Sequence, residues 1–305
     1  MWSADSVLRV LRARGEIWQA TPGLVGLRGD VLRLQRAIER QLSRFATAET
    51  DDEWCVPAGI ALETLERADY FDSFPHWLTV AAHLSDDASQ LERVARATSP
   101  SSAARSAVAP AKAALAPAVC YHVYSALAGS IVTSQRIVTA QGICWRHEGE
   151  RHSPLERGWA FTMREVVCIG TQAEVAAFLE RAERRVLEIA SELQVEADVV
   201  PATDPFFAPT GRGKSLLQQV KGLKREVAFP LDATRTVAAA SLNNHETFFG
   251  KTFAIRLPAG ESAATGCVAF GLERWTLAFL CAHGPDAARW PSVSGANAVH
   301  AEALK

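Results

Sequence analysis

The sequence predicts an α+β fold in which the helices gather on one side of an antiparallel sheet. From Val119 onward, short segments rich in β-branched and aromatic residues are separated by loops, which is typical of antiparallel strands. One long amphipathic segment, residues 172–197, interrupts these strands, and a second apolar helical segment follows the last of them. The chain shows no regular strand–helix alternation, which argues against the parallel sheet of a dinucleotide-binding fold.

The composition is that of an ordinary globular protein. The chain has 305 residues, of which 48% are hydrophobic and 22% are charged, enough to bury a full core. Its net charge of -2 gives no general attraction to nucleic acid. No apolar run reaches the roughly 20 residues that span a bilayer, and the N-terminus lacks the apolar core of a secretory signal. We therefore expect a cytoplasmic protein without membrane contact, in which the six scattered cysteines are reduced.

In the first part of the chain, the spacing of apolar residues predicts three helices. Residues 30–45 carry them three and four positions apart, after an aspartate that can cap the helix. A second helix is expected over residues 57–68, because proline is tolerated in a first turn. Residues 70–75 indicate a short extended piece, and residues 86–97 a third helix. Residues 99–116, rich in Ala, Ser and Pro, are consistent with either a surface loop or a weakly packed helix.

The second part of the chain contains the strands and two further helices. Residues 172–197 form the long helix, and residues 272–284 a closing helix entered from a strand end. The predicted strands are residues 119–127, 136–148, 158–171, 234–242, 252–257 and 266–272.

A basic segment lies between these strands. Its beginning, "APTGRGKS", is not a phosphate-binding loop, because alanine stands at the first required glycine and no strand precedes it. Residues 214–225 predict a helix with an apolar face. Its cations are either a solvated face or a patch for an acidic partner. The basic residues of this segment are Arg212, Lys214, Lys221, Lys224 and Arg225.

Three separated stretches resemble a known set of motifs. "LERADYFDSFP", then "CWRHE" followed by "RGWAFTMRE", then "GCVAFGLERW", resemble in order motifs 1, 2 and 3 of class II aminoacyl-tRNA synthetases. The third looks most like the atypical archaeal seryl-tRNA synthetases, which carry zinc in the active site. Through "CYHVY" and "SLNNHETFFGK" as well, the chain resembles the bacterial amino acid:[carrier protein] ligases, homologues of that catalytic core. The resemblance implies a class II synthetase-like antiparallel sheet flanked by helices.

The resemblance also implies an ATP site on the second motif. Class II enzymes join an amino acid carboxylate to the α-phosphate of ATP, so two anions must be held together and their charge offset. The implied catalytic residues are Arg146, between the α-phosphate and the carboxylate, and Arg274, on the γ-phosphate. An arginine fork suits both kinds of oxyanion. Glu148 would accept from the adenine amino group, Phe161 would stack on the adenine ring, and Arg157 would reach the outer phosphates.

The magnesium site departs from the family pattern. Synthetases place a glutamate on the strand before motif 3, a few residues ahead of a Ser or Asn, whereas this chain has alanines around Ala238. Ser241, which we expect to bind ATP, remains on that strand with Asn243 and Asn244. Glu246 is acidic but out of register. ATP and Mg²⁺ are expected, with the protein ligands of the magnesium left open.

Three residues match the metal ligands of the zinc-bearing seryl enzymes. Cys120, Glu165 and Cys267 correspond to a Cys, a Glu on the returning strand of motif 2, and a Cys before motif 3. Three protein ligands leave a fourth place open at a tetrahedral Zn²⁺, which a deprotonated substrate amino group can take. Taken singly, each cysteine is more simply a buried structural thiol, as we expect of Cys144 and Cys168.

The family resemblance defines the expected function. It implies that ATP is used to adenylate a small amino acid, glycine or alanine. The amino acid would then be transferred to the phosphopantetheine thiol of a carrier protein, and the basic segment would bind that carrier protein. We expect one catalytic domain over residues 1–305, with residues 1–50 as an N-terminal helical extension and no tRNA-binding domain. A homodimer is expected, with Tyr70 and Phe74 in a two-fold contact. A synthetase-like enzyme acting on tRNA or a small molecule, and a non-catalytic amino-acid-binding paralogue, remain as alternatives.

Overall fold

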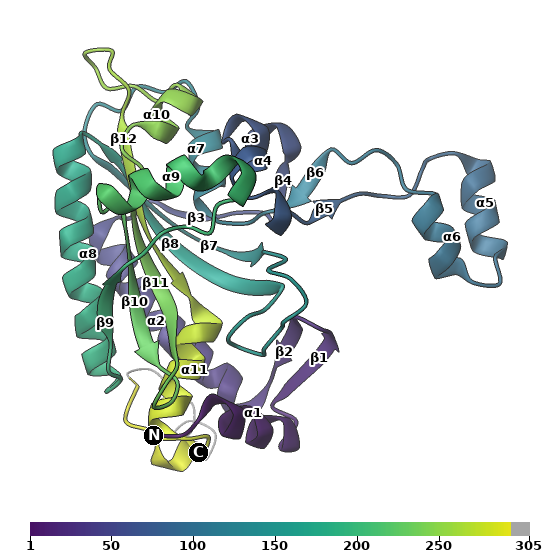
Figure 1. Cartoon of the computed structure of the whole chain (residues 1–305), viewed down its shortest axis with the longest axis horizontal. Coiled ribbons are helices and arrows are strands. Elements are labelled where there is room, and N and C mark those ends of the chain that lie inside the picture. The colour runs from purple at the N-terminus through teal and green to yellow at the C-terminus, as the bar shows by residue number, and fades with distance from the viewer. Residues whose placement is uncertain (294–305) are drawn as a thin grey trace, which may run out of the picture.

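The centre of the molecule is a seven-stranded sheet with helices on both faces (Figure 1). The computed structural model describes residues 1–293, with the backbone alone for residues 208–210. In spatial order the strands are β3 (Glu53–Cys55), β7 (Arg136–Trp145), β8 (Ala160–Gly170), β12 (Ala264–Gly271), β11 (Thr236–Asn244), β10 (Lys224–Pro230) and β9 (Asp198–Pro201). Only the edge strand β3 is parallel to its neighbour, so the predicted α+β class with a largely antiparallel sheet is confirmed. The prediction that the helices gather on one side of the sheet is wrong, because each face carries an apolar core that helices cover.

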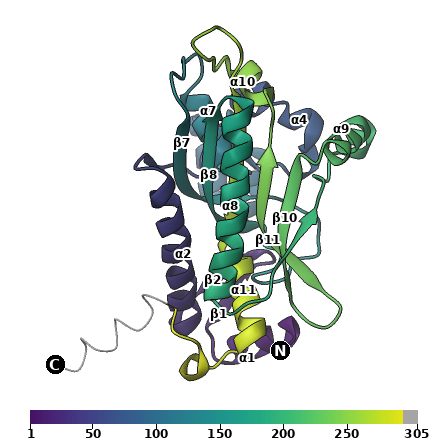
Figure 2. The same cartoon turned by 90° about the vertical axis from the view of Figure 1, so that its left-hand side faces the viewer.

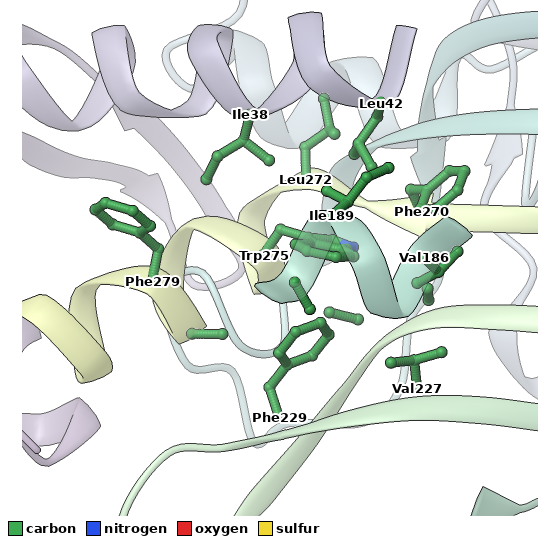
Figure 3. Packing of buried hydrophobic residues seen from close by; sticks show 14 of the residues in the cluster. Ile38, Leu42, Val186, Ile189, Val227, Phe229, Phe270, Leu272, Trp275 and Phe279 are labelled. Carbon is green, nitrogen blue, oxygen red and sulfur yellow. The ribbon is translucent and has the colours of Figure 1, made fainter. Parts of the chain in front are cut away.

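One face of the sheet carries the main core. The long helices α2 (Gly29–Glu49) and α8 (Gln172–Glu192) and the closing helix α11 (Leu272–His283) pack on it, and Figure 2 shows α8 running along the strands. Trp275 of α11 is fully buried with its ring centroid 4.6 Å from that of Phe229 (Figure 3). Burial of each such side chain stabilises the fold by about 1.5–3 kcal/mol.

The opposite face of the sheet carries shorter elements and a second core. Helices α7 (Cys120–Ala126) and α10 (Phe248–Phe253) pack on β8 and β12 there. Further elements complete this side of the molecule. They are α3 (Leu62–Arg67), α4 (Tyr70–Ser73), the 3₁₀ turn η1 (Pro75–Trp77), helix α9 (Ala208–Val220) and a small sheet of β4 (Gly59–Ala61), β6 (Ala113–Leu115) and β5 (Val80–Ala81).

The N-terminal region is integral to the fold. Residues 1–50, predicted as a helical extension, contain helix α1 (Ala4–Ala13) and also a hairpin of β1 (Ile17–Thr21) and β2 (Leu24–Leu27). Helices α1 and α2 both bury residues in the main core. The expected aspartate cap of α2 is wrong by two positions, because the helix is capped at Arg28.

A two-stranded arm projects from the body. Strands β5 and β6 lead to the helices α5 (Ala88–Arg96) and α6 (Pro100–Ser106), which lie far from the sheet in Figure 1. No residue of either helix is buried. The predicted helix over residues 86–97 is thus confirmed, and the segment that the sequence left open, residues 99–116, contains a helix followed by a strand.

Several element predictions are wrong. Residues 119–127 form α7 rather than a strand, because their buried residues recur at helical spacing. Residues 70–75 form a helix and the start of η1 rather than an extended piece. The helix expected from residue 57 begins at Leu62, after strand β4. Residues 252–257 are not a strand, since α10 occupies their start and Ala254 adopts a left-handed conformation.

The predicted helix over residues 214–225 and the motif 1 assignment also need correction. Helix α9 ends at Val220, because Gly222 has φ +60° and turns the chain into β10. "LERADYFDSFP" contains no strand, whereas α2 leads directly into the edge strand β3 and so has the helix–strand form of motif 1. No helix within the described residues is both long and apolar enough to cross a membrane.

Candidate active site

Two cavities lie side by side on the strands β8, β12 and β11. The first, about 120 Å³, is lined by five of the six residues predicted to bind ATP, namely Arg146, Glu148, Phe161, Ser241 and Arg274. The second, about 420 Å³, is lined by the three predicted metal ligands and extends under α4 and α9. The residues that line both cavities are Arg146, Met163, Lys224, Ser241 and Ala269. The two cavities therefore meet at Arg146.

Arg146 follows the end of β7 and is held in place by neighbours of both cavities. Its Nε donates to the carbonyl of Pro117 at 2.8 Å. The guanidinium carbon lies 5.6 Å from the ring centroid of Trp77 and 5.4 Å from that of Phe161. These contacts fix the plane of the fork and leave donors free to bind an anion at the junction.

Arg274 is anchored at the far side of the first cavity, in the first turn of α11. Its Nε donates to the carbonyl of Glu156 at 2.8 Å and one terminal nitrogen to that of Ala238 at 3.0 Å. Burial lowers the pKa of Arg274 from its usual value, although an arginine stays charged at neutral pH. Arg157 does not line either cavity; its exposed side chain lies 3.7 Å from the carboxylate of Glu148.

The three predicted metal ligands converge on one point. The ligand atoms of Cys120, Glu165 and Cys267 all lie within 4.8 Å of one another, and all three residues are buried. They come from α7, β8 and β12, which the antiparallel pairing of β8 and β12 brings together. One carboxylate oxygen of Glu165 accepts from the backbone N–H of Val119 at 2.8 Å, whereas the other, Oε2, is buried without a hydrogen-bond partner among the described residues.

The electrostatics of this cluster fit a bound cation. Burial and the adjacent Cys267 raise the pKa of Glu165 to about 8. A hydrogen bond to Cys267 and burial raise the pKa of the Cys120 thiol, while hydrogen bonds from Cys120 and His245 lower that of Cys267. Asn243 also donates to the Cys267 sulfur at 3.5 Å. Two thiols and a carboxylate buried together form a donor set suited to Zn²⁺, whose charge would favour the deprotonated forms of all three.

Comparison with known proteins agrees with this geometry. The chain is 36% identical over 230 residues to amino acid–[acyl-carrier-protein] ligase 2 of Bradyrhizobium diazoefficiens, covering 74% of this chain and 68% of that relative. The chain belongs to the amino acid–[acyl-carrier-protein] ligase family of enzymes. No protein-family model matches it.

The more distant similarities of this ligase family member are to tRNA ligases. The chain is 29% identical over 192 residues to the type-2 serine–tRNA ligase of Methanopyrus kandleri, covering 58% of this chain and 36% of that relative. Its fold matches that of M. kandleri SerRS, solved in complex with A. aeolicus tRNASec, with a TM-score of 0.84 and 22% identity. The match covers 94% of this chain and 59% of the other. The predicted class II synthetase-like fold is thereby confirmed.

Two charged residues line the cavities although the sequence did not predict this position for either, since Lys224 was expected on a partner-binding helix and Glu226 was not singled out. Lys224 lines both cavities, where its ammonium lies 2.6 Å from Asp204 and 3.0 Å from Glu226. Glu226 lines the first cavity and pairs in register with Ser241 on the neighbouring strand. Both belong to β10, whose start was assigned to a helix. The alternation of Lys224 and Glu226 on one face was the signal that could have identified them.

The N-terminal hairpin also contributes to the ligase site. Val25 and Leu27 of β2 line the first cavity together with Arg274. The carbonyl of Gly23 accepts from the backbone N–H of Trp159 at 2.8 Å, which ties the hairpin to the loop between β7 and β8. Gly23 has φ +81°, a turn conformation that favours glycine.

The predicted partner-binding cations do not form a free basic patch on the ligase. Lys214 of α9 lies 2.5 Å from Asp69 and 2.6 Å from Asp72 of α4. Lys221 contacts Glu246 at 2.9 Å, and Arg225 contacts Glu183 at 2.8 Å. Lys224 is buried in the cavities and Arg225 belongs to β10, so neither lies on the helix. Arg212 remains exposed on α9.

The expected dimer contact through Tyr70 is wrong as well. Tyr70 is only 2% exposed, because it packs inside one chain against Tyr121 and Phe74, and a partner chain cannot reach it. Phe74 is half-buried and stacks on Trp77 and Phe206. Tyr70, Phe74 and Trp77 all line the second cavity.

Proposed function

We propose that this protein adenylates a small amino acid, glycine or alanine, with ATP and transfers it to the phosphopantetheine thiol of a carrier protein. The observation that carries the proposal is the meeting of the two cavities at Arg146. One cavity holds the nucleotide residues and the other the metal cluster, so the α-phosphate and the amino acid carboxylate would meet at the guanidinium. The relative from B. diazoefficiens is named for this class of ligase.

The first step needs positioning and charge neutralisation. The substrate carboxylate attacks the α-phosphorus of ATP and pyrophosphate leaves. Arg146 would bind oxygens of both reactants, and Arg274 would bind the outer phosphates. Both guanidiniums are pre-oriented by hydrogen bonds to backbone carbonyls, so little reorganisation is needed as the charge moves. Glu148, Phe161 and Ser241 line the same cavity and would bind the adenosine part of ATP.

A metal would fix the other end of the amino acid. Cys120, Glu165 and Cys267 would hold Zn²⁺, which supplies a Lewis-acid site for the uncharged substrate amino group. Around it the cavity wall is formed by aromatic and amide side chains that include Phe249 and Asn243.

Magnesium would need a ligand other than the missing glutamate. Ala238 lines the first cavity where synthetases carry that acid. Glu226, on the adjacent strand, faces the same cavity beside Ser241. We propose that Glu226 and Ser241 lie nearest to the Mg²⁺ that accompanies ATP, with Lys224 offsetting part of the acid's charge.

Amino-acid-dependent exchange of labelled pyrophosphate into ATP tests the activation step. Exchange with glycine or alanine, but not with larger amino acids, is expected. Activated enzyme is then offered a phosphopantetheinylated carrier protein or tRNA. Labelling of the carrier alone supports the proposal, and labelling of tRNA would favour the synthetase-like alternative. Absence of exchange with every amino acid would favour the non-catalytic paralogue.

The carrier would dock on α9. This helix and α4 form the outer wall of the second cavity, through Lys214, Leu217 and Tyr70 among others, and an extended thiol arm can enter between them. The outer side of α9 exposes Leu216 and Val220, which are 62% and 75% exposed and lie one turn apart. An apolar patch of this kind is typical of a protein contact. Arg212 and Lys221, on the same helix and just after it, would add charge complementarity.

Replacing Leu216 and Val220 together by serine is expected to impair transfer but not activation. Transfer at subsaturating carrier should fall by about tenfold or more, because two apolar contacts of the docking face are lost. Pyrophosphate exchange should stay unchanged, since neither residue lines the cavities. Leu91→Ser, at an exposed leucine of the arm, is the matched control. Normal transfer by the double variant would place the docking site elsewhere.

We also propose a homodimer. In class II enzymes the helix and strand of motif 1 form the two-fold contact, and α2 with the edge strand β3 has that form here. The outer edge of β3 offers unpaired backbone groups to a second copy. Light scattering at micromolar concentration is expected to give twice the chain mass. A monomer under these conditions would contradict the proposal.

A further inference from the structure

The wall of the second cavity contains two residues with a buried side-chain oxygen that lacks a hydrogen-bond partner within the described part of the chain. These are Glu165, through Oε2, and Tyr70, through its hydroxyl. The carboxylate oxygen is explained by the metal that the cluster would hold. Buried polar groups in native proteins are nearly always hydrogen-bonded, so the hydroxyl of Tyr70 needs an explanation too.

Packing does not explain the hydroxyl. The ring of Tyr70 makes apolar contacts with Tyr121, at a centroid distance of 5.8 Å, and with Phe74, at 5.5 Å. A phenylalanine would make both. A contact with a partner chain is excluded by the burial of the residue. Among the described residues the hydroxyl has no partner, and a molecule bound in the cavity would be able to supply one.

The lining of the cavities indicates where that hydroxyl can act. Tyr70 and Arg146 both line the second cavity, in which the amino acid would lie. Tyr70 does not line the first cavity, so its hydroxyl would act on the amino acid rather than on the nucleotide. Burial raises the pKa of Tyr70, so the phenol stays neutral and can donate one hydrogen bond.

We propose that the Tyr70 hydroxyl donates a hydrogen bond to the carbonyl oxygen of the activated amino acid and acts in the transfer step. This inference rests on the proposed function. The thiolate sulfur of the carrier arm attacks the carbonyl carbon of the adenylate, and a C–S bond forms while the C=O electrons move onto oxygen. The oxyanion then collapses, the C–O bond to phosphate breaks, and AMP leaves with that electron pair. The thiol proton is lost to solvent, and Tyr70 keeps its own proton.

The direction of charge movement makes the effect specific for transfer. During adenylation the carboxylate loses negative charge, so a donor on its second oxygen gives no acceleration. During thioester formation the same oxygen gains negative charge, and a donor aimed at it stabilises the transition state. Arg146 serves both steps, whereas Tyr70 would serve the second.

Tyr70→Phe tests the inference in the full-length protein. Single-turnover transfer from preformed adenylate to the carrier should fall by about 100-fold, the usual effect of one oxyanion donor. Pyrophosphate exchange should change by less than about threefold, because adenylation does not use the donor. The melting temperature should not fall, because removal of an unpartnered buried hydroxyl costs no hydrogen bond.

The possible outcomes are distinct. Transfer by Tyr70→Phe at the wild-type rate overturns the inference and leaves the proposed function intact. An equal loss of exchange and transfer, together with a lower melting temperature, also overturns it and assigns Tyr70 a structural role. If the wild-type protein forms adenylate but labels neither the carrier nor free pantetheine, the proposed function fails and the inference fails with it.

Discussion

Arg146→Ala is expected to lower amino-acid-dependent pyrophosphate exchange by about 10³-fold, since loss of one preorganised donor to a developing oxyanion costs about 10²–10³ and this residue would serve two anions. Arg146 is the only arginine that lines both cavities within the described residues. Arg146→Lys should recover only part of the loss, because an ammonium keeps the charge but not the bidentate fork.

The control for this prediction comes from the same loop. Arg151 is an exposed arginine that lines neither cavity, and Arg151→Ala should exchange at the wild-type rate. Both variants should melt at similar temperatures, since neither side chain belongs to a hydrophobic core. Exchange by Arg146→Ala within tenfold of wild type would mean that the carboxylate and the α-phosphate do not meet at this residue.

Cys267→Ala is expected to abolish both zinc binding and amino acid activation. Metal analysis should find one Zn²⁺ per wild-type chain and almost none in the variant, because only two of the three clustered ligands remain. The fold should persist, since Cys267 is one small residue in a large apolar cluster. Zinc affinity of the wild-type protein should also fall as the pH drops below about 8, because Glu165 and the thiols must lose their protons to bind the metal.

Cys168→Ala provides the matched control. Cys168 is buried on β8, opposite Gly266 in the pairing with β12, but its side chain faces the main core. This variant should keep its zinc and its activity. A full complement of zinc in Cys267→Ala would show that the metal, if bound, uses other ligands.

The parts of the fold that the sequence predicted are those with strong local periodicity. The strands β7, β8, β11 and β12 alternate or carry runs of β-branched residues, and α2 and α8 have apolar stripes at helical spacing. Residues 119–127 show the limit of this approach. Valine and tyrosine favour strands, but Cys120, Val123 and Tyr124 pack into the second core from a helix, and that preference comes from tertiary contacts.

In the candidate site, too, the sequence could not predict the positions that depend on tertiary contacts or on the backbone conformation of single residues. The cluster of Cys120, Glu165 and Cys267 was predicted through family resemblance, since residues 45 and more positions apart carry no local signal of their proximity. Lys224 was misplaced because the helical spacing was extended past Gly222, whose backbone conformation ends the helix. Tyr70 was misplaced because a short helix at the cavity was taken for an interface strand.

The projecting arm is expected to unfold locally, independently of the rest of the molecule. Because no residue of α5 or α6 is buried, few contacts are lost when these helices unfold while the rest of the chain stays native. Their amide hydrogens should therefore exchange with solvent deuterium through local opening, at a free energy well below that of global unfolding. Amides of β8 and β12, at the centre of the sheet, should exchange only when the whole molecule unfolds. The arm is then a separate cooperative unit, and a protease would cut it before any other element of the described chain.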